Sequence, residues 1–175
     1  FNSAKVNERV TELLTVLSSR ENLKALITPY PQDKRIFKIG FKKLSQLYLL
    51  NVSGDHNYVN SFPHQLSDLT IYLTGAKIGF ESDNLETVKL FSASDRALNT
   101  IKFGANKSIK SVYCNGINNV TIDGCDSLTS LTATTTNESY QNSFVSVRHC
   151  ENILNIHAYS ESLYLDNLPQ LKQLF

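Results

Sequence analysis

One spacing recurs along this chain: an aliphatic residue is followed three positions later by another apolar residue, and usually two positions after that by a third. Eight repeats of this pattern start, in order, at Leu23, Leu44, Leu66, Leu85, Ile109, Leu128, Ile153 and Leu171. Successive starts are about 21 residues apart, and a repeated period of that length is typical of solenoid proteins. The period predicts an architecture, but it identifies neither a ligand nor a reaction.

A second, shorter apolar pair precedes most repeat starts by seven or eight residues. These pairs are Phe37 and Ile39, Ile78 and Phe80, Ile101 and Phe103, Val120 and Ile122, Val145 and Val147, and Leu163 and Leu165. Alternation with period two predicts extended strands with one side facing inward. The repeat between Leu44 and Leu66 lacks a clean pair and offers only Val59 and Phe62 as poor substitutes.

Each repeat, or rung, is therefore expected to contain two short strands. A single rung cannot bury its own apolar side, so neighbouring rungs must stack at about 4.8 Å to form both the core and the strand hydrogen bonds. We expect a mainly β fold, in which residues 21–175 form a solenoid of about seven stacked rungs with parallel strands.

The apolar residues among the first twenty positions have a different spacing. Val6, Val10, Leu13, Leu14 and Leu17 recur at helical spacing, with polar residues between them. Residues 1–20 are predicted to form an amphipathic helix that caps the open end of the apolar stack, because solenoid ends need covering. A partner-binding or membrane-surface helix is the alternative.

Composition excludes several classes of function. The chain has 17 basic and 16 acidic residues without a run of like charge, so we expect no nucleic-acid partner. No apolar segment approaches the length of about 18 residues that a spanning helix needs, which predicts no membrane insertion. The chain begins at Phe1 and stops within a repeat, so we expect a fragment or processed product whose solenoid continues or is truncated at the C-terminus.

Part of the chain resembles a known family. The stretches Asn106–Cys114 and Val120–Leu131 are similar to the irregular leucine-rich repeats of bacterial cell-surface proteins, in which a cysteine often closes one strand and a Gly-Cys-x-x-Leu phrase opens the next repeat. The close match covers about one rung, and the general spacing covers Leu23 to Phe175.

The chain departs from that family at the asparagine expected three residues after the last strand aliphatic. Other residues occupy that position, namely Ala93, Ile117, Thr136 and Glu161. Without this asparagine ladder, a flatter, two-sided parallel β-solenoid is the alternative to a curved leucine-rich repeat.

The three cysteines fit the repeat better than they fit catalysis. Cys125 and Cys150 occupy equivalent positions one rung apart, and Cys114 lies at a core position. Buried thiols that pack as small apolar residues are the first interpretation, and a Cys125–Cys150 disulfide is the second. Because no CxxC or HExxH spacing is present, we expect no metal and no cofactor.

Function is expected on the outward side of the main strands, because inward positions are committed to packing. Strand register predicts a binding face that carries Tyr48, Tyr72, Lys89, Phe91, Tyr113, His157 and Tyr159. Aromatic side chains provide a large contact area at low entropic cost, and both proteins and sugars use such surfaces. The competing interpretation is that aromatic and threonine residues simply suit strands.

The second strands carry a charged series at one offset on three successive rungs, formed by Asp123, Arg148 and Asp166. A structural salt ladder is the first interpretation, because Arg148 would keep both acids ionised. A general acid and base pair of the kind found in parallel β-helix glycosidases and lyases is the alternative. His149 has no expected partner at matching register.

These observations predict a noncatalytic recognition module, secreted or displayed at the cell surface, that binds a protein or a carbohydrate through the tyrosine-bearing sheet. The alternatives are a fragment of a carbohydrate-active β-helix enzyme and a cytoplasmic repeat scaffold. Specificity is also expected in variable loops around Asp55–Gln65, Ser92–Ala97 and Thr136–Ser143. An unpaired strand edge at the C-terminal end could support oligomer formation.

Overall fold

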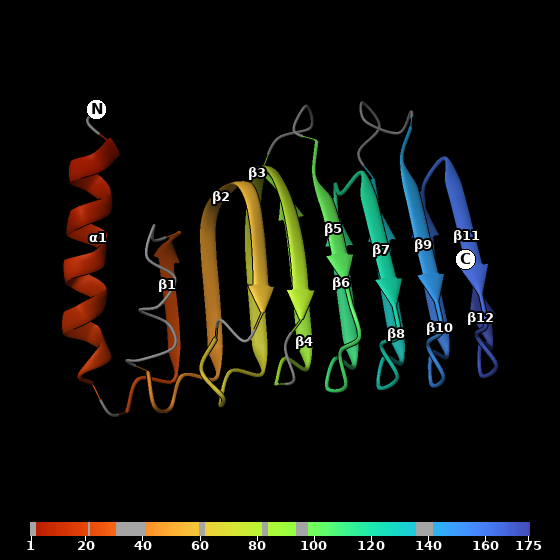
Figure 1. Cartoon of the computed structure of the whole chain (residues 1–175), viewed down its shortest axis with the longest axis horizontal. Helices are drawn as coiled ribbons and strands as arrows, with labels where there is room; N and C mark the ends of the chain where they lie inside the picture. Colours follow the sequence, from red (N-terminus) through yellow and green to blue (C-terminus); the bar gives the residue numbers. More distant parts are fainter. Residues whose placement is uncertain are drawn as a thin grey trace.

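The computed structural model describes residues 3–20, 22–30, 41–59, 62–81, 84–93, 98–135 and 142–175. One helix and a series of strands follow one another along the chain (Figure 1). They are α1 (Ser3–Ser18), β1 (Ala25–Pro29), β2 (Gln46–Val59), β3 (Asp68–Glu81), β4 (Thr87–Ser92), β5 (Thr100–Phe103), β6 (Ser111–Asn115), β7 (Asn119–Asp123), β8 (Ser130–Thr134), β9 (Phe144–Arg148), β10 (Asn155–Tyr159), β11 (Ser162–Asp166) and β12 (Gln173–Leu174).

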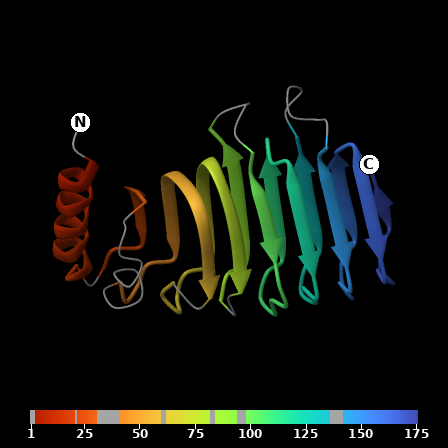
Figure 2. The same ribbon diagram turned by 45° about the horizontal axis from the view of Figure 1, so that its top comes forward.

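The strands wind into a parallel β-solenoid of about six turns, as Figures 1 and 2 show. The first sheet contains β1, the first halves of β2 and β3, and then β4, β6, β8, β10 and β12. The second sheet contains the second halves of β2 and β3, and then β5, β7, β9 and β11. This arrangement confirms the predicted mainly β solenoid of parallel strands and corresponds to its two-sided alternative, with about six turns where the spacing predicts about seven rungs.

Strands β2 and β3 belong to both sheets because each is long and bent. Each has 14 residues, and a glycine with left-handed backbone lies within each of them, Gly54 with φ 85° and Gly75 with φ 89°. Glycine adopts this conformation without the steric cost that a Cβ imposes. The two glycines therefore let the chain turn from one sheet to the other without leaving the strand.

The predicted loop at Asp55–Gln65 is wrong in its first part. Residues 55–59 form the second half of β2, where His56 pairs with Ile78 and Tyr58 pairs with Phe80. Val59 pairs with Glu81. The repeat pattern misses this strand because residues 55–59 do not alternate between apolar and polar, while pairing with β3 satisfies its backbone.

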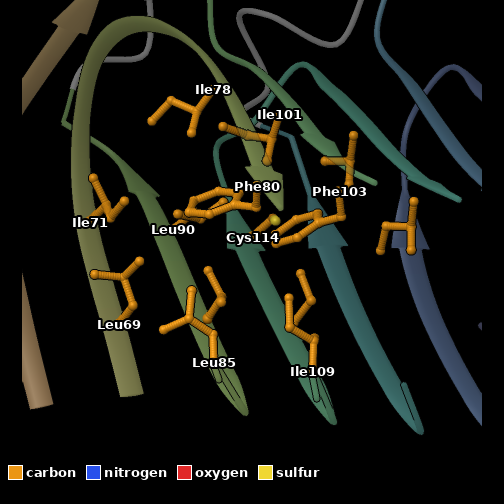
Figure 3. Close-up of a cluster of buried hydrophobic side chains, with 14 of the residues drawn as sticks. Leu69, Ile71, Ile78, Phe80, Leu85, Leu90, Ile101, Phe103, Ile109 and Cys114 are labelled. Carbon is orange, nitrogen blue, oxygen red and sulfur yellow. The ribbon is translucent and has the colours of Figure 1, made fainter. Parts of the chain in front are cut away.

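Equivalent apolar residues stack on one another inside the coil, and Figure 3 shows part of this core. Ile78 pairs with Ile101 and Phe80 with Phe103, as the second apolar pairs predict. The rings of Phe80 and Phe103 are stacked, with centroids 4.8 Å apart and planes 13° apart. Both rings are fully buried, so this contact combines apolar burial with a favourable aromatic pair.

The residues that start the repeats form another line of the core. Leu44, Leu66, Leu85, Ile109, Leu128 and Ile153 are all completely buried. They lie where the chain turns into the first sheet. The repeat of about 21 residues in the sequence is therefore the distance along the chain between equivalent buried residues at this corner of successive turns. The predicted pair Phe37 and Ile39 lies outside the described residues.

Helix α1 lies beside β1 at the N-terminal end of the stack (Figure 1). Its Leu14 is buried in the core, and Val10 and Leu17 are partly buried against it. Leu13 was expected on the same apolar stripe, but it is exposed, because the contact with the stack is narrower than the stripe. The capping position predicted for this helix agrees with these contacts.

Apolar side chains are uncovered at the other end of the stack. Leu163 on β11 is 40% exposed, whereas Val145, its partner on β9, is 1% exposed. Leu174 and Phe175 are also exposed. Association of copies through this edge stays a prediction.

A short ladder of buried asparagines supports the start of the second sheet. The side-chain oxygen of Asn99 accepts hydrogen bonds from the backbone N–H groups of Gly75 (3.2 Å) and Ala76 (3.0 Å). One turn later, the side-chain oxygen of Asn118 accepts from the backbone N–H of Asn99 at 2.9 Å. Asn118 follows Ile117 directly, so asparagine side chains do bridge turns here, one residue beyond the position that leucine-rich repeats use.

We predict that Asn118→Ala lowers the free energy of unfolding by about 1–3 kcal/mol, because it leaves the buried N–H of Asn99 without its acceptor. Urea denaturation followed by circular dichroism measures this change. Asn119→Ala is the matched control, because Asn119 is only partly buried and its amide makes a long 3.4 Å contact with Thr100. Equal destabilisation by the two substitutions would contradict the bridging role of Asn118.

Candidate functional site

The outward residues of the first sheet form straight rows across the turns. In one row Tyr48, Thr70, Lys89, Tyr113, Thr132 and His157 are successive Cα partners. In the next row the partners are Tyr72, Phe91, Asn115, Thr134 and Tyr159. All seven predicted binding residues therefore lie in two adjacent rows of this face, in the predicted register.

Three of these residues form a series of ring contacts with Phe91 in the middle and are called here the aromatic ladder: Tyr72, Phe91 and Tyr113. The rings of Tyr72 and Phe91 are stacked, with centroids 5.3 Å apart and planes 18° apart. The rings of Phe91 and Tyr113 are tilted at 45°, with centroids 5.5 Å apart. These separations are close to the spacing between neighbouring strands, so the stack follows from the fold itself.

The ladder is accessible to a partner. Tyr72 is 37% exposed, and Phe91 and Tyr113 are partly buried by their neighbours. Because the rings of Tyr72 and Phe91 are stacked, one face of each ring is covered by the other ring. The amide of Asn115 donates a 3.4 Å hydrogen bond to the hydroxyl of Tyr113, which helps to hold that ring in place.

The other predicted residues lie on either side of the ladder. Lys89 is the neighbour of Tyr113 in the first row, and a small hollow of about 90 Å³ lies between Lys89 and Tyr48. His157 and Tyr159 lie two strands beyond the ladder, beyond the threonines of β8. The His157 ring lies 6.1 Å from that of Phe175, a surface aromatic that the predicted set of binding residues omits. Phe175 extends the first row beyond His157, because its N–H donates to the carbonyl oxygen of Ile156 and its own carbonyl oxygen accepts from the N–H of Ala158.

A second group of polar residues meets at one corner of the second sheet. Asp123, Arg148 and Asp166 are successive Cα partners, as their common offset predicts. The guanidinium of Arg148 donates to Asp123 at 2.9 Å. This contact confirms one step of the salt ladder.

His149 belongs to the same cluster, against the expectation that it has no partner. Its Nδ1 lies 2.8 Å from a carboxylate oxygen of Asp123, and its Nε2 lies 3.9 Å from Asp166. The backbone of His149 is left-handed, with φ 51°, as it is at the equivalent Gly124 and Asn167. This turn conformation directs the imidazole between two carboxylates, and the alternating strand pattern could not predict it.

The cluster keeps Asp123 in its ionised form. The hydrogen bond from His149 is the main reason that the pKa of Asp123 lies below its usual range; burial, the next largest effect, raises this pKa, and the charge of Arg148 lowers it further. A general acid requires a raised pKa instead. The arrangement is that of a structural ion pair at a partly exposed corner.

The cysteines are buried thiols. Cys114, Cys125 and Cys150 are free and have no exposed surface. The thiol of Cys125 donates to the carbonyl oxygen of Gly104 at 3.3 Å, and that of Cys150 to Arg148 at 3.2 Å. This agrees with the first of the two interpretations of these residues.

Two further expectations concern the rest of the chain. Most of the predicted loops at Ser92–Ala97 and Thr136–Ser143 lies outside the described residues. Within the part of the chain that the structure describes, no helix is both long and apolar enough to cross a membrane.

Comparison with known proteins found no relative of this chain: no protein-family model, curated protein or solved structure matches it. The resemblance of one rung to irregular leucine-rich repeats therefore stays a prediction from the sequence.

The lowered pKa of Asp123 predicts a pH-dependent contribution to stability. This contribution is present at pH values above the unfolded-state pKa of about 3.9 and is lost as the pH falls through the lower pKa of the folded state. Asp123→Asn should lower the free energy of unfolding by less than about 1 kcal/mol at pH 7, because the carboxylate is 35% exposed and solvent screens it.

Urea denaturation at pH 7 and at pH 2 measures the difference between the wild type and Asp123→Asn, which should become smaller at the lower pH. Asp126→Asn controls for the loss of one carboxylate from the same corner. A difference that persists unchanged at pH 2 would show that the contribution does not come from ionised Asp123.

Burial also predicts slow thiol chemistry. Loss of solvation raises the pKa of Cys125 to about 12 and raises the pKa values of Cys150 and Cys114. Because the thiolate is the reactive form, native protein should react with Ellman's reagent at pH 8 far more slowly than free cysteine. All three thiols should react at once in guanidinium chloride, and a fast-reacting thiol in the native protein would contradict this assignment.

Proposed function

We propose that this chain is a noncatalytic recognition module that binds a partner through the outward face of the first sheet. The observation that carries the proposal is the aromatic ladder, three neighbouring rings on a face whose outward positions contribute little to the core. Aromatic residues are enriched at the centres of binding interfaces. A rigid sheet presents them with little further loss of conformational entropy on binding.

Ring geometry favours a protein partner over a glycan. Sugars pack their C–H groups against open aromatic faces, and stacking covers one face of Tyr72 and one face of Phe91. Ring edges and the hydroxyl groups of Tyr72 and Tyr113 suit contacts with apolar side chains and backbone carbonyls instead. Lys89, next to the ladder, adds a positive charge that an acidic side chain can approach.

The second sheet supports the noncatalytic form of the proposal. Its acidic cluster holds Asp123 ionised by contacts with Arg148 and His149. An enzyme that hydrolyses glycosidic bonds by acid and base catalysis needs one carboxyl group that stays protonated. The pairing at this corner works against that requirement.

Selection of a random peptide library displayed on phage, with the protein immobilised, tests the proposal. We expect the selected peptides to bind the triple variant Tyr72→Ser, Phe91→Ser, Tyr113→Ser at least about tenfold more weakly, a loss of about 1.4 kcal/mol or more. Circular dichroism and urea denaturation establish that the variant is folded.

Tyr164→Ser is the matched control, since Tyr164 is an exposed aromatic on the second sheet. It should leave peptide affinity unchanged. Peptides that bind the triple variant as tightly as the wild type would overturn the proposed face. Loss of binding in Tyr164→Ser alone would move the recognition surface to the second sheet.

A further inference from the structure

The second sheet has a hollow on its outward side, separate from the aromatic ladder on the first sheet. Its volume is about 390 Å³, within the range of about 300–1,000 Å³ that small-molecule sites occupy. Its lining comes from the second halves of β2 and β3 and from two residues of β5. The lining residues are Asp55, His56, Lys77, Ile78, Gly79, Thr100 and Lys102.

A glycine makes room for the hollow. Gly79 lies at an outward position of β3, and its partner on β5 is Lys102. The next residues in that row are Thr121 and Ser146, which have side chains. The lack of a side chain at Gly79 therefore leaves space between Lys77, two residues earlier on the same strand, and Lys102 on the next turn.

Two lysines lie diagonally across this space. Lys77 pairs with Thr100, and Gly79 pairs with Lys102, so the two lysine Cα atoms are roughly 8 Å apart from the strand spacing and the rise per residue. Both side chains are exposed. Long flexible side chains at this separation can bring both ammonium groups to one ligand above Gly79.

Neither ammonium group is neutralised by a close carboxylate among the described residues, since no ion pair there involves Lys77 or Lys102. Three acidic positions border the hollow, and one of them is Glu81, two residues after Gly79 on β3, whose side chain lies against Gly104, two residues after Lys102. Asp55 is the partner of Lys77 on β2, and Asp123 is close enough to Lys102 for its pKa to be lowered by that charge. The lining itself carries two lysines against one aspartate.

The donors fit an oxoanion with at least three acceptor oxygens. Each lysine offers a compact positive charge with rotatable N–H donors, and Thr100 adds a hydroxyl group between them in the register. A phosphate group can accept from all three at once, whereas a carboxylate has two oxygens. Asp55 repels an anion from its end of the hollow, which favours a position near Thr100 and Lys102.

We propose that this hollow binds a phosphate group, either free or as the monoester of a small hydroxylated molecule. The volume exceeds what a bare phosphate needs, and the aliphatic stems of the lysines offer apolar walls for the organic part of an ester. The carboxylate of Asp55, at the far end, can accept hydrogen bonds from the hydroxyl groups of that part. This site is independent of the recognition face on the first sheet.

Nuclear magnetic resonance of ¹⁵N-labelled protein, at pH 7 and low ionic strength, tests the site with three probes: inorganic phosphate, glucose 6-phosphate and glucose. We expect both phosphates to shift the backbone amide signals of Gly79, Thr100 and Lys102, and glucose to leave them unchanged. Tighter binding of glucose 6-phosphate identifies an ester site, and equal binding of the two phosphates identifies a site for the free anion. Added salt should weaken both, because the contacts are exposed charges.

Two variants separate charge from shape. Lys77→Gln with Lys102→Gln should weaken phosphate binding at least about tenfold, whereas Lys107→Gln with Lys172→Gln, which removes the same charge elsewhere on the surface, should have little effect. Gly79→Val should fill the hollow and weaken glucose 6-phosphate more than inorganic phosphate. Absence of localised shifts with both phosphates, or equal affinity in the two lysine variants, would overturn the proposal.

Discussion

Parallel stacking of equivalent residues, one turn on the next, is the constraint on which the rest of this structure depends. Each strand pairs in register with the strands of the turns before and after it, so every side chain has its own equivalents as lateral neighbours. Equivalent positions in successive turns must therefore carry side chains that tolerate the same degree of burial or exposure. This stacking of equivalent positions produces an aromatic pair on each side of the backbone. The rings of Phe80 and Phe103 stack inside the core, and the rings of Tyr72 and Phe91 stack on the outward face.

The same constraint explains which features could be predicted from the sequence. Period-two alternation and a repeat of about 21 residues are enough to assign both sheets, their register and the outward rows, because a shift by one residue would expose the core. They also bring Asp123, Arg148 and Asp166 together across three turns. These predictions require only the strand alternation and the repeat length, and no detail of individual turns.

Features that depend on individual turns or on side-chain direction could not be predicted in this way. The left-handed backbone of His149 brings its imidazole to Asp123, although a strand pattern carries no information about that turn. The pairing of His56 with Ile78 and of Tyr58 with Phe80 is set by the strand of the next turn, and the composition of residues 55–59 does not indicate it. Asn99 and Asn118 look like ordinary loop residues until the path of the backbone places N–H groups within their reach.

The outward surfaces of the two sheets differ in shape, and this difference bears on the proposed functions. On the first sheet, the large side chains of the aromatic ladder contact each other in adjacent turns, and the proposed partner would bind across them. On the second sheet, Gly79 interrupts the row and the surface is hollowed between two lysines. Because inward packing fixes the backbone on both sides, substitutions on one face alter its contacts with little effect on the other. A solenoid of this kind can therefore carry a broad recognition surface and a small ligand site on opposite sides of one core.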